Sequence, residues 1–428
     1  MIAIFISEEQ ILRNYFLASE WSILPSNEKI LLLANEEIYP ILSRLSARGD
    51  IPIDHLILPL QVNVTGNFLL NLCITVLRNL SKSSSVFRQI KKEQELGKSS
   101  QIKSFARIIL YKLSGVFPKI QNVVRFLLFY QSKNQSIEEV LIKSKARVAI
   151  ALAITNPEDA IFLLNAKRLG IRTIASTRSW DNLSSHGALL VVPDILIIHS
   201  KLMRYQLARY HKIPNKCEVL ERKVPWYSNK FKPIRETKHI ANPKHGTRVL
   251  YACTGPYHFP NETQFLDALS KKLQNTSIEL TILQHPKSQH PLQLFTSEQK
   301  VKMFPYLNQE EQSSLVSYYQ FLQGFDLVVG SGSTVLLDAQ FLGKKVCAFF
   351  PEDISGYWAS VSRFEDSEQH YSEFISRLGI KIFHDLEDLA IALHNIHTIN
   401  TKNHDAVDYF VGEQHMHDFN LQEIIGQN

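Results

Sequence analysis

The sequence predicts an α/β protein made of two doubly wound domains, each with a parallel sheet between layers of helices. The chain has 428 residues, more than one hydrophobic core usually holds. Short apolar runs alternate with helix-length segments in both halves, as in parallel βαβ units. A polar, proline-bearing stretch at 224–246 separates the two series and is typical of an inter-domain linker.

Each predicted strand is a short apolar run bounded by charged or turn-forming residues. In the first half these runs are 2–6, 29–34, 55–59, 147–154, 172–176, 195–199 and 217–220. In the second half they are 248–253, 279–283, 326–329 and 345–350. We therefore expect an N-terminal domain at 1–223, the linker at 224–246 and a C-terminal domain at 247–428.

Composition excludes several classes of protein. The chain is 45% hydrophobic and 21% charged, as in an ordinary globular protein. Its four cysteines lack metal-binding spacing, and Cys253 and Cys347 lie in strand-like runs, so we expect buried thiols, a reducing cytoplasm and no structural zinc. We find neither a secretory leader nor the ~18-residue apolar run that spans a bilayer. GxGxxG and GxxxxGK[ST] loops are also absent, which argues against dinucleotide dehydrogenases and P-loop NTPases.

A basic segment at 78–133 interrupts the alternation in the first half. It has twelve lysines and arginines against Glu93 and Glu95, about +10 in a chain whose net charge is +6. Cations alternate with apolar residues from Phe105 to Tyr130, which predicts a helical insertion divided at Pro118. We expect a peripheral contact with an anionic inner-membrane surface; a solvated charged face is the alternative. No motif for nucleic-acid binding accompanies the charge, so we expect no such partner.

A glycine- and hydroxyl-rich turn follows the strand at 326–329. Gly332 allows the backbone to approach a ligand closely, and Ser333 and Thr334 offer donors at the start of a helix. These features together predict a phosphate site at the carboxyl edge of a sheet. An N-capped turn without a ligand is the alternative.

Two further turns of the second half are expected at the same edge. His285 and Pro286 follow the strand at 279–283, where an imidazole can donate to a phosphate. Gly255 belongs to the turn after the first strand of this domain. A structural or merely exposed histidine is the alternative for His285.

The histidine-proline pair and the later Ser-Thr pair resemble the donor-binding half of several bacterial GT-B transferases. These families are the sialyltransferases and capsule Kdo transferases, which use CMP-activated sugars, and the teichoic-acid glycerophosphotransferases, which use CDP-glycerol. The resemblance implies that His285, Ser333 and Thr334 hold the nucleotide phosphate and that Asp338 faces the nucleotide sugar. It also implies two facing Rossmann-like domains, an active site in the cleft between them, and no metal or cofactor, with fixed donors stabilising the leaving phosphate.

The polar stretch at 176–187 follows a buried strand of the first half. Its Trp-Asp-Asn-Leu-Ser-Ser sequence is similar to a stretch of surface-polysaccharide transferases, and an inverting transferase needs a base for the acceptor hydroxyl. We expect Asp181 as that base, with His186 second; Glu8 and Glu9, after the first strand, keep the assignment open. The residues expected on the acceptor side are Trp180, Asn182 and Ser184. Alternatively, Asp181 and Asn182 cap a helix and Trp180 packs in the core.

We therefore expect a glycosyltransferase that moves a sugar to a surface glycan or a lipid-linked glycan acceptor by metal-independent inverting transfer. The expected donor is a CMP-activated acidic sugar of the nonulosonic-acid or Kdo type. One alternative is a UDP-sugar transferase or UDP-sugar 2-epimerase, which would use histidine near the same strand ends. A non-catalytic scaffold in glycan assembly is the alternative from a different class.

Overall fold

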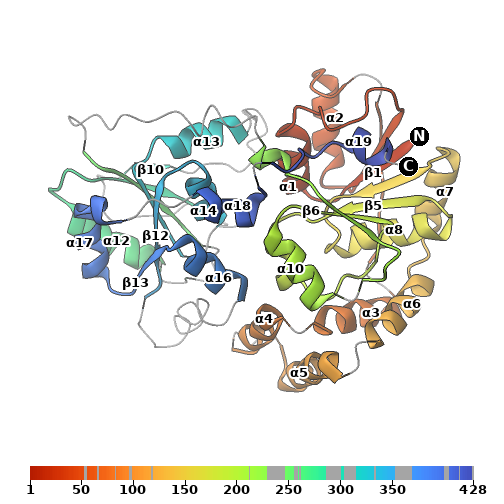
Figure 1. Ribbon diagram of the computed structural model, residues 1–428, viewed down its shortest axis with the longest axis horizontal. Coiled ribbons are helices and arrows are strands. Elements are labelled where there is room, and N and C mark those ends of the chain that lie inside the picture. The colour runs from red at the N-terminus through yellow and green to blue at the C-terminus, as the bar shows by residue number, and fades with distance from the viewer. Residues whose placement is uncertain are drawn as a thin grey trace. The chain divides into compact units, whose positions relative to one another are not determined.

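The computed structural model divides into two compact units (Figure 1). Unit 1 comprises Met1–Ser228 and Tyr409–Asn428, and unit 2 comprises Asn229–Asp408. The structure describes the chain except for residues 53–54, 65–66, 82, 96–98, 117–118, 212, 229–245, 255–258, 260–261, 286–299, 303–314, 332–333, 352–368, 400–403, 414 and 427–428.

Unit 1 contains a seven-stranded parallel sheet with the order β3-β2-β1-β4-β5-β6-β7. The chain starts at the centre, moves outward to β3 and returns to place β4 beside β1. The sheet therefore has a topological switch point between β1 and β4, where ligands bind in doubly wound folds. Its strands are β1 (Ile2–Ile6), β2 (Ile30–Ala34), β3 (His55–Pro59), β4 (Val148–Ala151), β5 (Arg172–Ser176), β6 (Ile195–Ile198) and β7 (Glu218–Glu221).

Helices cover both faces of this sheet. Every residue of β1, β2, β4 and β6 is buried, as expected of parallel strands with helices on each side. On one face, Phe5 packs on Phe162 with ring centroids 5.3 Å apart. The helices of unit 1 are α1 (Glu9–Ile11), the π-helix η1 (Leu12–Leu17), α2 (Tyr39–Ala47), α3 (Phe68–Asn79), α4 (Ser84–Glu95), α5 (Gln101–Val116), α6 (Ile120–Gln131), α7 (Gln135–Lys143), α8 (Pro157–Arg168), α9 (Asn182–Ser185), α10 (Lys201–Tyr210), η2 (Pro225–Tyr227) and α19 (Leu421–Gly426).

The connection between β3 and β4 carries the basic segment at 78–133. This connection contains α3 to α7, and the basic segment covers the end of α3 together with α4, α5 and α6. Helix α5 ends at Val116 and α6 begins at Ile120; the expected break at Pro118 lies outside the described residues. Within the described chain, none of the helices is long and apolar enough to cross a bilayer.

Unit 2 contains a second parallel sheet with the order β10-β9-β8-β11-β12-β13 and a switch point between β8 and β11. Its strands are β8 (Arg248–Ala252), β9 (Glu279–Leu283), β10 (Lys300–Lys302), β11 (Leu327–Gly330), β12 (Lys345–Phe349) and β13 (Lys381–Phe383). Its helices are α12 (Glu262–Leu273), α13 (Leu315–Gln323), α14 (Thr334–Phe341), α16 (Gln369–Leu378), α17 (Leu386–His394) and η4 (Ile396–Thr398), and α18 (His404–Val411) leads back into unit 1.

The expected fold class, two Rossmann-like α/β domains, is confirmed, and each of the eleven predicted strands is present. The edge strands β10 and β13 were not predicted because each has three residues, too few for a periodic signal. All four cysteines are buried free thiols, which confirms the expectation for Cys253 and Cys347.

The C-terminal segment departs from the expected domain boundaries. Residues 247–428 were expected to form one domain, but Tyr409–Asn428 belongs to unit 1. Lys223 exchanges backbone hydrogen bonds with His417 and Phe419 at 2.8 and 2.9 Å. The Phe419 ring packs against Tyr15, with centroids 5.1 Å apart. Tertiary contact fixes this placement, and local sequence pattern carries no trace of it.

We predict that Phe419→Ala destabilises unit 1 by about 3–5 kcal/mol, because it removes a large buried ring and leaves a cavity. Urea unfolding followed by tryptophan fluorescence measures this, since Trp21, Trp180 and Trp226 lie in unit 1. Phe105→Ala is the matched control; that ring is 65% exposed, and its loss changes stability by about 0.5 kcal/mol or less. Equal losses in both variants would contradict the docking of the tail.

Candidate functional site

Polar side chains gather at the carboxyl edge of the unit 1 sheet, beside its switch point. Glu8 follows β1, Asn156 follows β4 and Arg178 follows β5. Arg178 Nη1 donates to Glu8 Oε2 at 2.5 Å, and Asn156 Nδ2 donates to Glu8 Oε1 at 3.0 Å. Both carboxylate oxygens of Glu8 are therefore held, one by a side chain that follows the adjacent strand β4 and the other by a side chain that follows β5, the next strand of the sheet.

A buried carboxyl group fixes the base of this edge. Asp159, at the start of α8, accepts a hydrogen bond from the hydroxyl of Ser7 and another from the amide of Ala153 at 3.0 Å. Burial raises the pKa of Asp159 well above its usual value, although these hydrogen bonds lower it. The pair joins the end of β1 to the start of α8 and so sets the position of the neighbouring Glu8.

His186 is linked to Asp181 through one hydroxyl group. Ser185 Oγ lies 2.8 Å from His186 Nδ1 and 3.3 Å from Asp181 Oδ2. On the other side of the ring, Nε2 lies 3.5 Å from Arg178 Nη2, which can only donate. With Arg178 donating to Nε2, the ring proton is assigned to Nδ1, which donates to Ser185 Oγ. The Ser185 hydroxyl faces two oxygens of Asp181, the backbone carbonyl at 3.0 Å and carboxylate Oδ2 at 3.3 Å.

The imidazole of His186 is held neutral. Its pKa is lowered to about 4, mainly by burial and also by the charges of Arg178 and Arg78, against the opposing charges of Asp181 and Glu8. A neutral imidazole with an unprotonated Nε2 can accept a proton once the long contact with Arg178 is exchanged for one with a substrate hydroxyl, so this array can serve as a base with a carboxylate behind it. The structure thus brings the predicted Asp181 and His186 together with Glu8.

The other predicted residues of this stretch lie inside the turn. Asn182 Oδ1 accepts from the amide of Ser179 at 3.1 Å, and Ser184 Oγ donates to the carbonyl of Asp181 at 2.9 Å. Trp180 is buried, and its ring packs edge-on against Phe410, with centroids 5.5 Å apart. These contacts stabilise the turn that carries His186; a contact with an acceptor stays a prediction for all three.

Gly187 fixes the distance between this turn and α3. Its φ is +81°, and a Cβ there would lie 2.0 Å from the carbonyl oxygen of Arg78. The next amide, of Ala188, donates to the carbonyl of Leu77 at 3.2 Å. Only glycine allows this approach, so the His186 turn is seated directly on the end of α3.

A second network behind the turn was not predicted. Tyr15, in the π-helix η1, places its hydroxyl 2.9 Å from Ser176 Oγ and 2.8 Å from His199 Nε2, and donates to the carbonyl of Thr177 at 2.7 Å. His199 Nδ1 lies 2.9 Å from the carbonyl of Arg222, and burial lowers the pKa of His199 to about 4. The only available signal was polar residues at strand ends, which did not indicate that Tyr15 would join them.

The predicted donor site lies on three neighbouring strands of unit 2. His285 follows β9 and Thr334 opens α14 after β11, with β8 paired between these two strands. A Cβ on Gly330 would lie 3.3 Å from the carbonyl of Ala252, so β8 and β11 pack tightly at the switch point. His285 is half-buried and Thr334 is exposed. The other predicted donor residues, Gly255, Pro286, Gly332 and Ser333, lie outside the described residues.

Two carboxyl groups lie near this edge. Asp338 is buried and accepts a hydrogen bond from Tyr318 Oη at 3.0 Å, so its carboxyl is engaged within unit 2. Glu262, which was not predicted, accepts from the amide of Thr254 at 3.0 Å and from Tyr251 Oη at 3.1 Å. Burial raises the pKa of Glu262 to about 8. Its hydrogen bonds hold the backbone at Thr254, directly beyond the end of β8.

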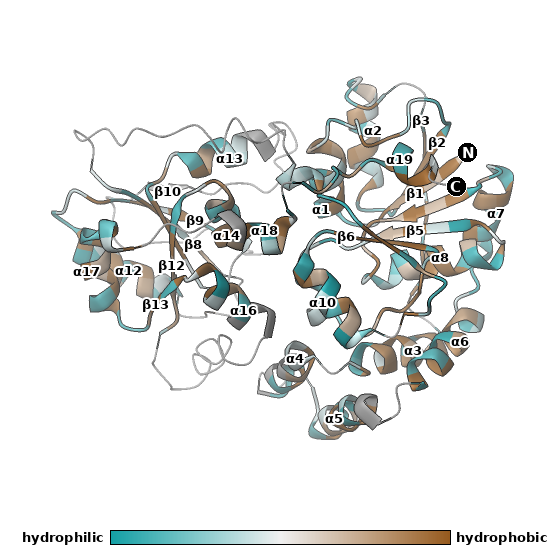
Figure 2. Cartoon of the chain, in the orientation of Figure 1, coloured by the Kyte–Doolittle hydropathy of each residue, from teal (hydrophilic) through white to brown (hydrophobic). Residues whose placement is uncertain are grey.

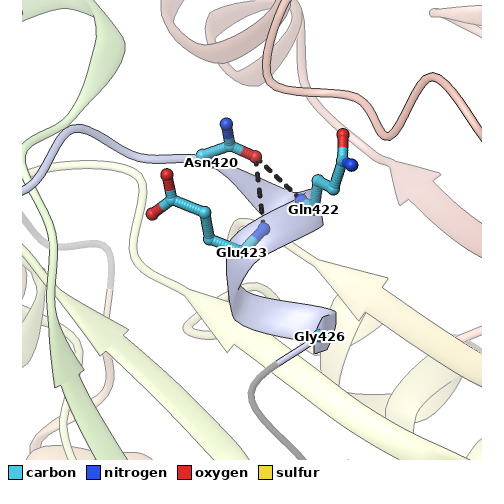
Figure 3. A pocket seen from close by; sticks show the side chains of 4 residues that line it. All are labelled: Asn420, Gln422, Glu423 and Gly426. Atoms are coloured by element: carbon cyan, nitrogen blue, oxygen red, sulfur yellow. Dashed lines mark hydrogen bonds between the residues drawn. The ribbon is translucent and has the colours of Figure 1, made fainter.

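A shallow pocket lies over α19, and none of the candidate site residues described above lines it. Figure 3 shows Asn420, Gln422, Glu423 and Gly426 around it. The side-chain oxygen of Asn420 accepts from the amides of Gln422 and Glu423 at 2.9 and 3.4 Å, which caps this short helix. Capping therefore explains the position of the Asn420 side chain in this pocket.

The fold is similar to that of several solved nucleotide-sugar enzymes. UDP-GlcNAc 2-epimerase from Neisseria meningitidis bound to UDP-GlcNAc matches with a TM-score of 0.51 and 10% identity over 99% of this chain and 98% of that chain. The S. aureus MnaA–UDP co-structure matches with a TM-score of 0.50 and 10% identity over 99% of this chain and 94% of that chain. UDP-GlcNAc 2-epimerase from Methanocaldococcus jannaschii matches with a TM-score of 0.50 and 11% identity over 99% of this chain and 98% of that chain. At this identity the similarity establishes the fold. No protein-family model and no curated sequence matches the chain.

We predict that the imidazole of His186 stays neutral from pH 8 down to about pH 5, because burial and the two arginines disfavour the imidazolium. Its ring resonance in NMR, assigned by its loss in His186→Gln, should move only near pH 4. The exposed His394, on α17, is the assignment control, and its resonance should persist in His186→Gln. Movement of the His186 resonance between pH 8 and pH 5 would contradict the buried array.

Proposed function

We propose that the protein is a glycosyltransferase that uses a nucleotide-activated sugar. The observation that carries the proposal is the array in unit 1, where Asp181, Ser185, His186 and Arg178 follow one another at hydrogen-bond distance beside a switch point. A carboxylate behind a neutral imidazole is suited to removing a proton from a hydroxyl group. Sugar transfer to a glycan hydroxyl needs that step.

In the proposed reaction, Nε2 of His186 takes the proton of the acceptor hydroxyl as its oxygen attacks the anomeric carbon of the donor. The bond from that carbon to the leaving phosphate breaks, and the nucleotide departs with the electron pair. Asp181 acts through Ser185 by stabilising the imidazolium that forms. An anionic donor beside the ring would raise the pKa of His186 from about 4 toward neutrality, which strengthens it as a base when substrate is bound.

The nucleotide phosphate is proposed to bind at the carboxyl edge of unit 2. His285, Ser333 and Thr334 supply donors, and the start of α14 adds positive potential, so no metal or cofactor is included in the proposal. Asp338 is proposed to act indirectly, because Tyr318 already engages its carboxyl. Within this site the favoured donor is a CMP-activated acidic sugar, and a UDP-sugar is the main competitor.

A UDP-sugar 2-epimerase is the second candidate. The fold similarity favours it, since three structures with TM-scores of 0.50–0.51 are UDP-GlcNAc 2-epimerases or a UDP complex. An epimerase converts the nucleotide sugar without an acceptor, whereas a transferase releases free nucleotide only when an acceptor hydroxyl is present. Product analysis with and without a glycan acceptor therefore separates the two activities.

We predict that one of the nucleotides CMP, CDP, UDP or GDP raises the melting temperature. A ligand that binds only the folded state stabilises it by about 2.7 kcal/mol at a hundredfold excess over Kd. His285→Ala and Ser333→Ala should abolish the shift, because each removes a phosphate donor. His394→Ala, an exposed histidine on α17, is the matched control and should keep it.

The identity of the nucleotide decides the donor class. A shift with CMP supports the CMP-sugar, and a shift with UDP moves the donor to a UDP-sugar. If no nucleotide gives a shift, the donor site is wrong and a non-catalytic scaffold becomes the better hypothesis.

We predict that His186→Gln lowers kcat by about 10²–10⁴-fold, because the base is lost, while nucleotide binding is retained. Asp181→Asn should lower kcat and also move the acidic limb of the pH–rate profile to lower pH. The limb moves to lower pH because the negative charge of Asp181 raises the pKa of His186, and the amide of asparagine does not. Asp50→Asn, at an exposed position, is the matched control.

A purely structural role for Asp181 would reduce activity without moving the acidic limb. Full activity of His186→Gln would remove the imidazole as the base and leave Glu8 as the alternative.

A further inference from the structure

The helices between β3 and β4 expose a set of large apolar side chains, here called the helical face. Figure 2 shows apolar residues on α3, α5 and α6. Ile102 is 84% exposed and Phe68 is 77% exposed, unusual values for large apolar residues. The helical face consists of Phe68, Leu69 and Leu72 on α3, Ile102, Phe105 and Ile109 on α5, and Val123, Phe126, Leu127 and Tyr130 on α6.

These residues form stripes on packed neighbouring helices. Helix α3 packs against both α5 and α6. On α6 the exposed positions recur at intervals of three and four, which places them on one side of the helix. The rings of Phe126 and Tyr130 pack edge to face with centroids 4.8 Å apart. Large exposed apolar surfaces of this kind mark interaction sites.

The three helices of the helical face carry charge of one sign, and Glu93 of the neighbouring α4 is paired with Arg107 of α5. Helices α3, α5 and α6 contain no aspartate or glutamate. Lys103, Lys112 and Lys119 are exposed on or beside α5 and α6. An occupant must therefore offer an apolar interior and negative charge at its surface. A second copy of the chain would instead oppose lysine with lysine across a two-fold axis.

We propose that the helical face docks on an anionic phospholipid bilayer. Phenylalanine, leucine and isoleucine enter the boundary between headgroups and acyl chains, tyrosine lies at the headgroup level, and lysines reach the anionic headgroups. The face extends the predicted basic segment, because Phe68, Leu69 and Leu72 lie before it in the chain.

The same helices hold the turn that carries His186. Arg125, on α6, donates from Nε to the carbonyl of Leu189 at 2.8 Å. The amide of Ala188 donates to the carbonyl of Leu77 at the end of α3. Docking therefore fixes this turn with respect to the bilayer, which suits an acceptor carried on a lipid. The lipid-linked acceptor rests on the proposed function, whereas docking on the bilayer does not.

Flotation with lipid vesicles tests docking in the absence of nucleotide and acceptor, so the result is independent of the proposed activity. The full chain should float with phosphatidylcholine vesicles containing about 30% phosphatidylglycerol and bind pure phosphatidylcholine at least about tenfold more weakly. The double variant Phe126→Glu, Leu127→Glu should lose flotation. Ile391→Glu is the matched control, since Ile391 is an exposed apolar residue on α17 of unit 2.

Lysine variants test the charge separately from the apolar contact. Lys112→Gln and Lys119→Gln should each weaken binding to the anionic vesicles by about fivefold. Circular dichroism checks that all variants remain folded. The proposal is overturned if the folded native chain does not float, if the double variant floats as well as the native chain, or if neutral vesicles bind equally. A dimer of the native chain that the double variant breaks, without flotation, would assign the face to a second copy.

Discussion

The guanidinium group of Arg178 is the contact on which the unit 1 site depends. It joins the turn after β5 to the turn after β1 by donating to Glu8, and it lies 3.5 Å from the unprotonated Nε2 of His186. Its charge also helps to keep that imidazole neutral. Removing Arg178 would leave Glu8 without its main cation and His186 without the group that faces its lone pair. Arg178 therefore helps to set both the position of Glu8 and the protonation state of His186 at this edge.

Burial acts in the same way at both sheet edges. It favours the neutral forms of His186 and His199 in unit 1 and of Glu262 in unit 2, as the directions of their pKa shifts indicate. Neutral groups in fixed hydrogen bonds hold turns in place without the desolvation cost of a buried charge. At the unit 2 edge, Thr334 is exposed and His285 is half-buried. That edge thus combines fixed buried groups with polar side chains that reach the surface.

Local patterns predicted the sheets well, because a buried parallel strand is a continuous apolar run and appears as such in the sequence. The same reasoning found the turn with Asp181 and His186, since it follows β5 directly. It could not find the link through Ser185 or the partners of Glu8, because these depend on which strands become neighbours. The family resemblance implied that Asp338 faces the nucleotide sugar, and its contact with a nucleotide stays a prediction; the hydrogen bond from Tyr318 to its carboxyl is a tertiary contact that the sequence did not indicate. The position of Phe419 is likewise a tertiary outcome.

The return of the C-terminal segment to unit 1 has a consequence for synthesis on the ribosome. Unit 2 is continuous in the chain, so all of its residues are available before translation ends. Unit 1 begins first but lacks Phe419, and with it the ring that packs on Tyr15, until its last residues leave the exit tunnel. All seven strands of the unit 1 sheet are therefore synthesised long before the segment Tyr409–Asn428 that completes the unit. During that interval nascent unit 1 exposes apolar surface that Phe419 covers in the folded protein, the condition under which incomplete domains aggregate.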